Sequence, residues 1–247
     1  MTGVLCTISP QNGLVPGADF VRWNGAFGSP PEVQKYFQQL AVPRLLDLPG
    51  PRMKPRTSRI SDDEWLVFAR DAGYEYVGLS YVRHAQQILE LKERLRGSRT
   101  GMIAKIETRE AVDNLDTIVE ASDGVMIDRG DLSTAIGVLA LGAVQKHVAQ
   151  ACRRQKKLMI IATGLFASMR SAEQPGISEV SDAFNAVLDG ADYLMFAEET
   201  ALGRHPELVV AAMRKVIEAA DSYRALASDR DESEAGDAKR RSRTTGT

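Results

Sequence analysis

Cysteine is scarce in this sequence of 247 residues: Cys6 and Cys152 are far apart, and their spacing matches no metal or redox motif. Cys6 lies in an apolar, strand-like pattern, which predicts a core position. The longest apolar runs are only as long as strands, so no membrane-spanning helix is expected. The N-terminal segment MTGVLCTISP lacks a basic region followed by an apolar stretch, which argues against a signal peptide. We therefore expect a reduced, cytoplasmic setting.

The chain also lacks a strong charge of either sign, since its formal net charge is −2. This balance gives no reason to expect nucleic acid or membrane as a partner. A hydrophobic content of 44% and a charged content of 26% are ordinary globular values. Residues 228–247 contain almost no large apolar side chain, which predicts a disordered polar tail after a barrel domain of residues 1–227. The KRRSR cluster in this tail is interpreted as a solvated end.

What is present is a regular alternation of strand-like runs and helical patterns. Eight such runs occur, at residues 4–8, 20–23, 44–48, 76–80, 102–106, 125–127, 158–162 and 193–196. Helical patterns lie between most of them, at residues 31–40, 62–72, 85–95, 112–119, 141–154, 179–188 and 207–226. The predicted fold is α/β, a closed (β/α)₈ TIM barrel. Only about ten residues separate the first two runs, so the first crossover helix is expected to be short or missing.

The most informative stretch is residues 101–132, which reads as a strand–helix–strand unit of a parallel sheet. Lys105 and Glu107 are two residues apart at the end of the first strand and therefore face the same way. Asp131 follows the second strand. A lysine and two carboxylates at one end of a sheet suit a divalent cation and an anionic substrate. The alternative is an ordinary ion pair and an ordinary helix cap.

Active sites of TIM barrels lie in the loops after the strands. These loops supply further polar candidates: Arg22, Asn24, Asp47, Lys54 of the GPRMK run, Ser80, Arg83, Gly130, Thr163, Glu198, Glu199 and Thr200. Arginines and a lysine among carboxylates at one pole favour a small, highly charged anion bridged by a metal.

Several segments together resemble the pyruvate kinase family over nearly the whole ordered chain. AKIE with ASDGVM and RGDL is similar to the family's metal-binding segments, LLDLPGPRMK to its LLDTKGPEIR, VGLSYVR to its FLSFVR, and IATGLFASM to its TATQMLESM. VLCTISP, VRWN and EVSDAFNAVLDGADYLMFAEETALGRHP also find counterparts there. The resemblance implies the family's catalytic TIM-barrel domain.

The resemblance also implies roles for individual residues. Glu107 and Asp131 would hold Mg²⁺ or Mn²⁺, and Lys105 would stabilise or protonate an enolate. The amides of Gly130 and Asp131, with Thr163, would bind the carboxylate of phosphoenolpyruvate or pyruvate. Arg22 would meet a phosphate and act in catalysis with Lys105 and Thr163. Substrate binding would be completed by Ser80, Arg83 and Lys54, and a weaker K⁺ site would use Asn24 and Asp47. Arg83 as a plain ion pair and Asn24 as a turn cap are the alternatives.

Departures from the family pattern fall on nucleotide binding. Too few residues follow Lys54 for the family's lid domain, and we expect its C-terminal domain to be absent as well. The family's Ser and His after the VRWN-like strand are Ala26 and Phe27. Other changes are Lys54 for an arginine, Gly164 for a glutamine, and Leu202 for the lysine that meets the nucleotide.

Three functions follow as hypotheses. The first is a Mg²⁺-dependent enzyme that stabilises the enolate of pyruvate or a related 2-oxo acid, in aldolase- or lyase-type carbon–carbon chemistry. The second is a minimal pyruvate kinase that transfers phosphate between phosphoenolpyruvate and ADP, and the third is a non-catalytic binding protein. A small-molecule substrate and a homo-oligomer are expected in either enzymatic case.

Overall fold

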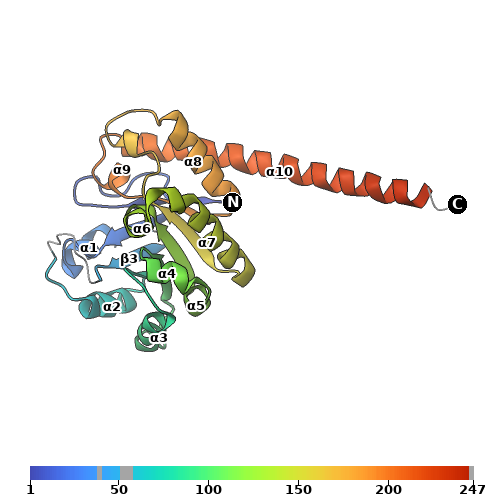
Figure 1. Cartoon of the computed structure of the whole chain (residues 1–247). Coiled ribbons are helices and arrows are strands. Elements are labelled where there is room, and N and C mark those ends of the chain that lie inside the picture. The colour runs from blue at the N-terminus through green and yellow to red at the C-terminus, as the bar shows by residue number, and fades with distance from the viewer. Residues whose placement is uncertain (38–40, 51–57, 245–247) are drawn as a thin grey trace.

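The structure is a closed barrel of eight parallel strands in sequence order, surrounded by helices (Figure 1). It is a computed structural model that describes residues 1–37, 41–50 and 58–244, with side chains as far as residue 227. The predicted (β/α)₈ barrel is thereby confirmed. The strands are β1 (Gly3–Thr7), β2 (Phe20–Asn24), β3 (Arg44–Leu48), β4 (Tyr76–Leu79), β5 (Gly101–Ile106), β6 (Gly124–Asp128), β7 (Leu158–Ala162) and β8 (Tyr193–Phe196).

The helices cover the outside of the barrel. They are α1 (Pro30–Phe37), α2 (Asp62–Asp71), α3 (Ala85–Arg94), α4 (Arg109–Asp113), α5 (Leu115–Ala121), α6 (Arg129–Ile136), α7 (Leu141–Gln155), α8 (Ile177–Leu188), α9 (Glu198–Ala201) and α10 (Pro206–Thr244), with 3₁₀ turns η1 (Val138–Ala140) and η2 (Ala167–Arg170). Residues 8–19, between β1 and β2, contain only turns and bends, so the first crossover helix is missing as predicted. The predicted helix end at residues 38–40 lies outside the described residues.

The last helix differs from expectation. α10 runs to Thr244, through most of the segment predicted to be a disordered tail. Residues 228–244 contain no proline, so no residue of that kind interrupts the helix that begins in the packed part of the chain.

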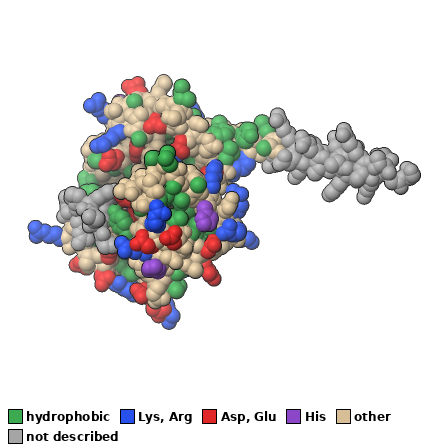
Figure 2. All heavy atoms as spheres, viewed as in Figure 1, with side chains coloured by type: hydrophobic (Ala, Val, Ile, Leu, Met, Phe, Trp, Pro, Cys, Tyr) green, Lys and Arg blue, Asp and Glu red, His purple; other side chains and the backbone are tan. Residues whose placement is uncertain are grey.

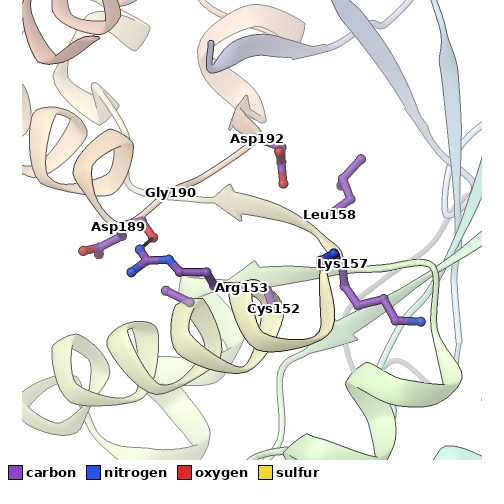
Figure 3. Close-up of a pocket in the computed structure, with 9 residues that line it drawn as sticks. Cys152, Arg153, Lys157, Leu158, Asp189, Gly190 and Asp192 are labelled. Carbon is purple, nitrogen blue, oxygen red and sulfur yellow. Dashed lines mark hydrogen bonds between the residues drawn. The ribbon is translucent and has the colours of Figure 1, made fainter. Parts of the chain in front are cut away.

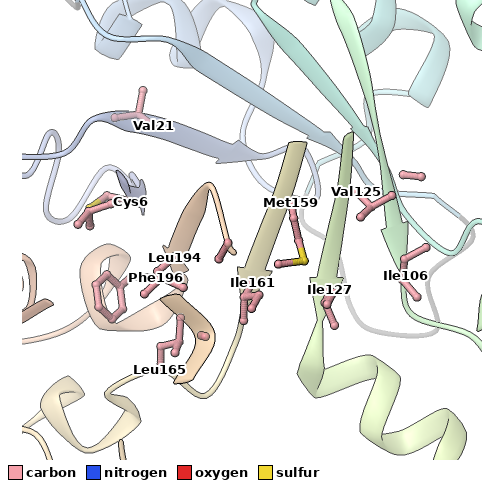
Figure 4. Close-up of a cluster of buried hydrophobic side chains, with 14 of the residues drawn as sticks. Cys6, Val21, Ile106, Val125, Ile127, Met159, Ile161, Leu165, Leu194 and Phe196 are labelled. Atoms are coloured by element: carbon pink, nitrogen blue, oxygen red, sulfur yellow. The ribbon is translucent and has the colours of Figure 1, made fainter. Parts of the chain in front are cut away.

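Two apolar clusters hold the barrel together. The larger one lies between the strands and the helices, and Figure 4 shows part of it, including Cys6 on β1 as predicted. The smaller one fills the barrel interior with one or two side chains from seven of the strands: Leu5, Phe20, Leu45, Ile103, Met126, Ile160, Ala162 and Met195. Because side chains alternate along a strand, the residues two positions later on these strands point into the carboxyl-terminal mouth.

Exposed apolar side chains gather where α10 leaves the barrel (Figure 2), and Tyr223 and Leu226 of α10 are more than half exposed. This position is consistent with the predicted homo-oligomer, which stays a prediction. No single helix among the described residues has the length and apolar character to cross a membrane; only the bent pair 129–136 and 138–155 meets that criterion, by length and composition alone.

Candidate active site

A layer of polar side chains lies directly above the apolar barrel interior. Arg22, Asp47, Lys105 and Asp128 each come two residues after an interior apolar residue, namely Phe20, Leu45, Ile103 and Met126. Because side chains alternate along a strand, the last inward-facing residues of β2, β3, β5 and β6 form one charged layer. We call this layer the floor of the site.

Lys105 is the centre of this floor. Its Nζ lies 2.8 Å from Glu107 Oε1, 3.3 Å from Asp47 Oδ2 and 3.5 Å from Asp128 Oδ2. It also donates a hydrogen bond of 3.3 Å to Ser80 Oγ. Burial alone would lower the pKa of Lys105, but the three carboxylates outweigh burial and raise it above its usual value. The ammonium therefore stays charged, which suits stabilisation of a nearby anion better than proton abstraction.

Arg22 and Asp47 form the second ion pair of the floor. Arg22 donates to Asp47 Oδ2 through Nε at 2.8 Å and Nη2 at 2.5 Å, and to Thr7 Oγ1 through Nη1 at 3.1 Å. Burial opposes ionisation of Asp47, yet Arg22 and Lys105 hold the pKa of its carboxyl below the usual range. Arg22 lines the cavity as predicted, but its guanidinium is committed to neighbours, which weakens the expectation that it meets a phosphate.

The side chain of Asp47 has room between the strands because the residue paired with it on β4 is Gly78, which has no side chain. A Cβ at Gly78 would lie 2.2 Å from Asp47 Oδ1. We expect Gly78→Ala to lower the free energy of unfolding by about 1–3 kcal/mol, because overpacking displaces the buried carboxylate. Urea unfolding measures this loss. Gly142→Ala is the control, since a Cβ there meets nothing within 4 Å. Equal unfolding midpoints for the two variants would contradict the prediction.

Three carboxylates gather beside Lys105. Oxygen atoms of Glu107, Asp128 and Asp131 all lie within 4.8 Å of one another. Glu107 is 2% exposed, and its Oε1 accepts no hydrogen bond of good geometry from the described residues, although Lys105 Nζ is 2.8 Å away. A set of carboxylate oxygens that includes the buried Glu107 fits a hard divalent cation such as Mg²⁺ or Mn²⁺.

Tyr81 holds two of these carboxylates in place. Its backbone N–H donates to Glu107 Oε2 at 2.6 Å, and its hydroxyl donates to Asp131 Oδ2 at 3.2 Å. The backbone of Tyr81 is left-handed, with φ 56°, which turns the chain sharply after β4. Neither Tyr81 nor Asp128 was predicted from the sequence. The period-two pattern of β6 signalled Asp128, but the predicted strand ended one residue too early at residue 127.

Neighbouring charges shift the pKa values of Glu107 and Asp128. Burial raises the pKa of Glu107, Lys105 opposes the shift, and the charge of Asp128 adds to it. Burial also acts on Asp128, but Lys105 and the hydroxyl of Thr163 prevail and lower the pKa of Asp128 to about 2. The Lys105 ammonium thus favours the charged forms of Glu107 and Asp128 against the effect of burial.

Gly130 and Thr163 lie close together beside the carboxylates. Gly130 lies on the first turn of α6, and a Cβ there would lie 2.9 Å from Thr163 Cγ2. Thr163 Oγ1 donates to Asp128 Oδ1 at 2.8 Å, and Thr163 has φ 70°, a strained conformation for a β-branched residue. Asp131 lies on the same first helical turn rather than at a strand end. Main-chain N–H groups of a first turn lack helical partners and suit a carboxylate.

These groups face one cavity of about 1200 Å³ at the carboxyl-terminal mouth of the barrel. Its described lining includes ten charged side chains, four cationic and six anionic: Arg22, Arg59, Lys105, Arg170, Glu32, Glu107, Asp128, Asp131, Glu198 and Glu199. Arg170 pairs with Glu198 at 2.6 Å. The excess of carboxylates favours a cation-dependent site.

Some residues that were predicted to bind substrate or K⁺ lie outside the cavity or make other contacts. Arg83 is not among the residues that line the cavity: it is exposed and pairs with Glu110 at 3.7 Å, which is the ion-pair alternative, and its substrate contact stays a prediction. Ser80 lines the cavity but donates to Leu48 O at 2.8 Å. Asn24 Oδ1 accepts from Ala26 N at 3.1 Å, which is the turn-cap alternative. A K⁺ site at Asn24 and Asp47 stays a prediction, and Lys54 lies outside the described residues.

A smaller cavity of about 390 Å³ lies where β7 and β8 begin, at the opposite pole (Figure 3). Its polar side chains form hydrogen bonds to the protein backbone: Arg153 donates to Asp189 O at 3.1 Å, and Asp192 accepts from Met159 N at 2.7 Å. Burial raises the pKa of Cys152 to about 12, so its thiol is neutral. This cavity lacks the features of a reactive site.

Comparison with known proteins agrees with this geometry. Residues 34–210 match the family described as "Pyruvate kinase, barrel domain". Pyruvate kinase of Mycobacterium intracellulare is 40% identical over 175 residues, which are 70% of this chain and 37% of that protein. Pyruvate kinase of Agrobacterium vitis is 37% identical over 179 residues, 72% of this chain and 37% of the relative. The chain thus spans little more than a third of the length of these relatives.

Proposed function

Because the chain belongs to the pyruvate kinase family, we propose that it binds a divalent cation and stabilises the enolate of pyruvate or a related 2-oxo acid. The observation that carries the proposal is the buried ammonium of Lys105 beside the Glu107–Asp128–Asp131 trio, on the floor of an open cavity. Mg²⁺ held by the trio would act as a Lewis acid on substrate oxygens. The reaction class is aldol- or lyase-type carbon–carbon chemistry at a pyruvate-like unit.

The residues of the chain supply binding and charge. The first-turn N–H groups of α6 at Gly130 and Asp131, with Thr163, receive the substrate carboxylate. Lys105 offsets the negative charge that develops on the carbonyl oxygen when a C3 proton passes to solvent water. Asp47 and Ser80 hold that ammonium in place, so it is already oriented when substrate arrives.

Phosphate transfer from phosphoenolpyruvate to ADP is the second candidate, since the relatives are named pyruvate kinase. Two features weigh against it. Only residues 49–61 connect β3 to α2, too few for the family's lid, and phosphoryl transfer depends on charge neutralisation in a water-protected site. Leu202 also lines the cavity where the family pattern has a lysine.

Hydrogen exchange tests the proposal directly. The protein with Mg²⁺ and pyruvate in D₂O is expected to speed loss of the methyl proton signal in NMR, and EDTA should abolish the effect. Absence of any acceleration with either Mg²⁺ or Mn²⁺ would overturn the proposal. ADP-dependent formation of pyruvate from phosphoenolpyruvate, assayed in parallel, would instead favour the second candidate.

A further inference from the structure

Part of the cavity wall that faces the carboxylates is apolar, although Glu198 and Glu199 after β8 line the same side. In a closed barrel of eight consecutive strands, β1 lies opposite β5 and β2 lies opposite β6. Glu107 follows β5, and Asp128 ends β6. Phe27 follows β2 and Leu202 follows β8, so these two side chains come from strands that flank β1, across the mouth from the carboxylates.

Phe27 and Leu202 are large apolar side chains left open to solvent. Phe27 is 46% exposed and Leu202 is 43% exposed, and both line the cavity. The same lining includes Ile8, Pro10, Ile60 and Ala201. Exposed apolar side chains that gather within one concave surface are typical of a binding site rather than of an ordinary protein exterior.

Hydrogen bonds fix the backbone beneath both side chains. Trp23 Nε1 donates to Phe27 O at 3.0 Å, and Phe27 N donates to Asn24 O at 3.0 Å. Gln11 Nε2 donates to Leu202 O at 3.3 Å. Asn12 Nδ2 donates to the carbonyls of Thr200 and Gly203, each at 3.0 Å. The apolar wall is therefore preorganised, which reduces the entropy lost when a ligand covers it.

The charges of the cavity argue against a polyphosphate at this wall. Of the four cationic side chains in the described lining, three are paired with carboxylates: Arg22 with Asp47, Lys105 with its carboxylate neighbours, and Arg170 with Glu198. At about 1200 Å³, the cavity is also far larger than a three-carbon acid requires. An uncharged group joined to the reacting acid satisfies both the size and the apolar lining.

We propose that the preferred substrate is a 2-oxo acid with an aryl or long alkyl substituent, which lies against Phe27 and Leu202 while the carboxylate end lies at the trio. This inference rests on the proposed function and names its substrate class.

Calorimetric titration with Mg²⁺ present tests it, with pyruvate and phenylpyruvate as probes. Phenylpyruvate is expected to bind the wild type at least about tenfold more tightly, as burial of a phenyl ring predicts. Leu202→Lys should remove most of this difference. Leu208→Lys is the matched control, because Leu208 is also 43% exposed but does not line the cavity, and it should retain the wild-type ratio.

The outcomes separate the two proposals. Equal, Mg²⁺-dependent binding of both acids by the wild type would overturn the apolar-wall proposal and leave the proposed function standing. An unchanged ratio in Leu202→Lys would also overturn it. Failure of both acids to bind with Mg²⁺ would overturn the proposed function, and the substrate class with it.

Discussion

Lys105→Met is expected to lower the free energy of unfolding by about 3–5 kcal/mol, the range found when one partner of a buried ion pair is removed. Lys105 is 4% exposed, and its ammonium is within 3.5 Å of carboxylate oxygens on Asp47, Glu107 and Asp128. Methionine fills a similar volume without the charge. The buried Asp47 and Glu107 and the partly buried Asp128 would then lose the ammonium, and Asp47 would keep its ion pair with Arg22.

Urea unfolding at neutral pH measures the loss, and Lys92→Met supplies the control. Lys92 Nζ lies 2.7 Å from Asp123 Oδ1, a distance like that of Lys105 to Glu107, but both partners are partly exposed. Exposed pairs contribute at most about 1 kcal/mol, so this variant should be near wild type. If the two variants lose equal stability, the floor is not held by the Lys105 charge, and the buried carboxylates are neutralised in another way.

The same substitution separates stability from chemistry. At a temperature where the variant is folded, Lys105→Met should slow C3 proton exchange of pyruvate by about 10²–10³-fold, as loss of one preorganised charge stabiliser does elsewhere. Folded protein with wild-type exchange would assign Lys105 a structural role only.

The barrel was predictable because its strands carry a simple signal. The apolar runs at 44–48, 158–162 and 193–196 coincide with β3, β7 and β8 in the structure. Each run is as long as a strand and is bounded by turn residues or helical patterns, so its type and its ends agree. The missing first crossover helix was also predictable, because the connection is too short to contain one.

The candidate site was predictable only where strand period and loop position agree. Lys105 and Glu107 lie on the same face and meet at 2.8 Å, as their spacing predicts. Asp128 was missed because one more inward residue of β6 was taken as part of the following loop. Tyr81 could not be found, because its left-handed φ depends on packing rather than on a local pattern.

Arg83 shows a limit of predicting site residues from their position after a strand. It follows β4 in sequence, and the neighbouring Val82 is fully buried while Arg83 is exposed beside Glu110. Proximity to a strand end is therefore insufficient, since neighbouring residues of this loop face opposite directions. The Arg22–Asp47 pair likewise required knowledge that β2 and β3 are neighbours in the barrel, with Asn24 aligned to Asp47.

Glu107→Gln is expected to weaken Mn²⁺ binding by more than about 100-fold, because loss of a ligand should exceed the 10–100-fold effect of outer-shell changes. Glu107 is the most buried member of the trio, so an amide there removes charge from the position least compensated by water. The electron paramagnetic resonance signal of free Mn²⁺ measures binding without any reaction. In the wild type, Mg²⁺ at 100 times its Kd should add about 2.7 kcal/mol of stability, and the variant should gain almost none.

Glu199→Gln is the matched control for this loss. Glu199 is also buried in the cavity wall, and burial raises the pKa of its carboxyl, but its Oε2 accepts from Ala197 N at 2.9 Å and it lies outside the trio. Its replacement should leave Mn²⁺ binding near wild type. Asp128→Asn adds the decisive comparison: a loss as large as that of Glu107→Gln makes Asp128 a third ligand, whereas a small loss restricts it to orienting Thr163 and Lys105. Wild-type affinity in Glu107→Gln would mean that the trio does not bind the cation, because no substitution removes its buried charge more directly.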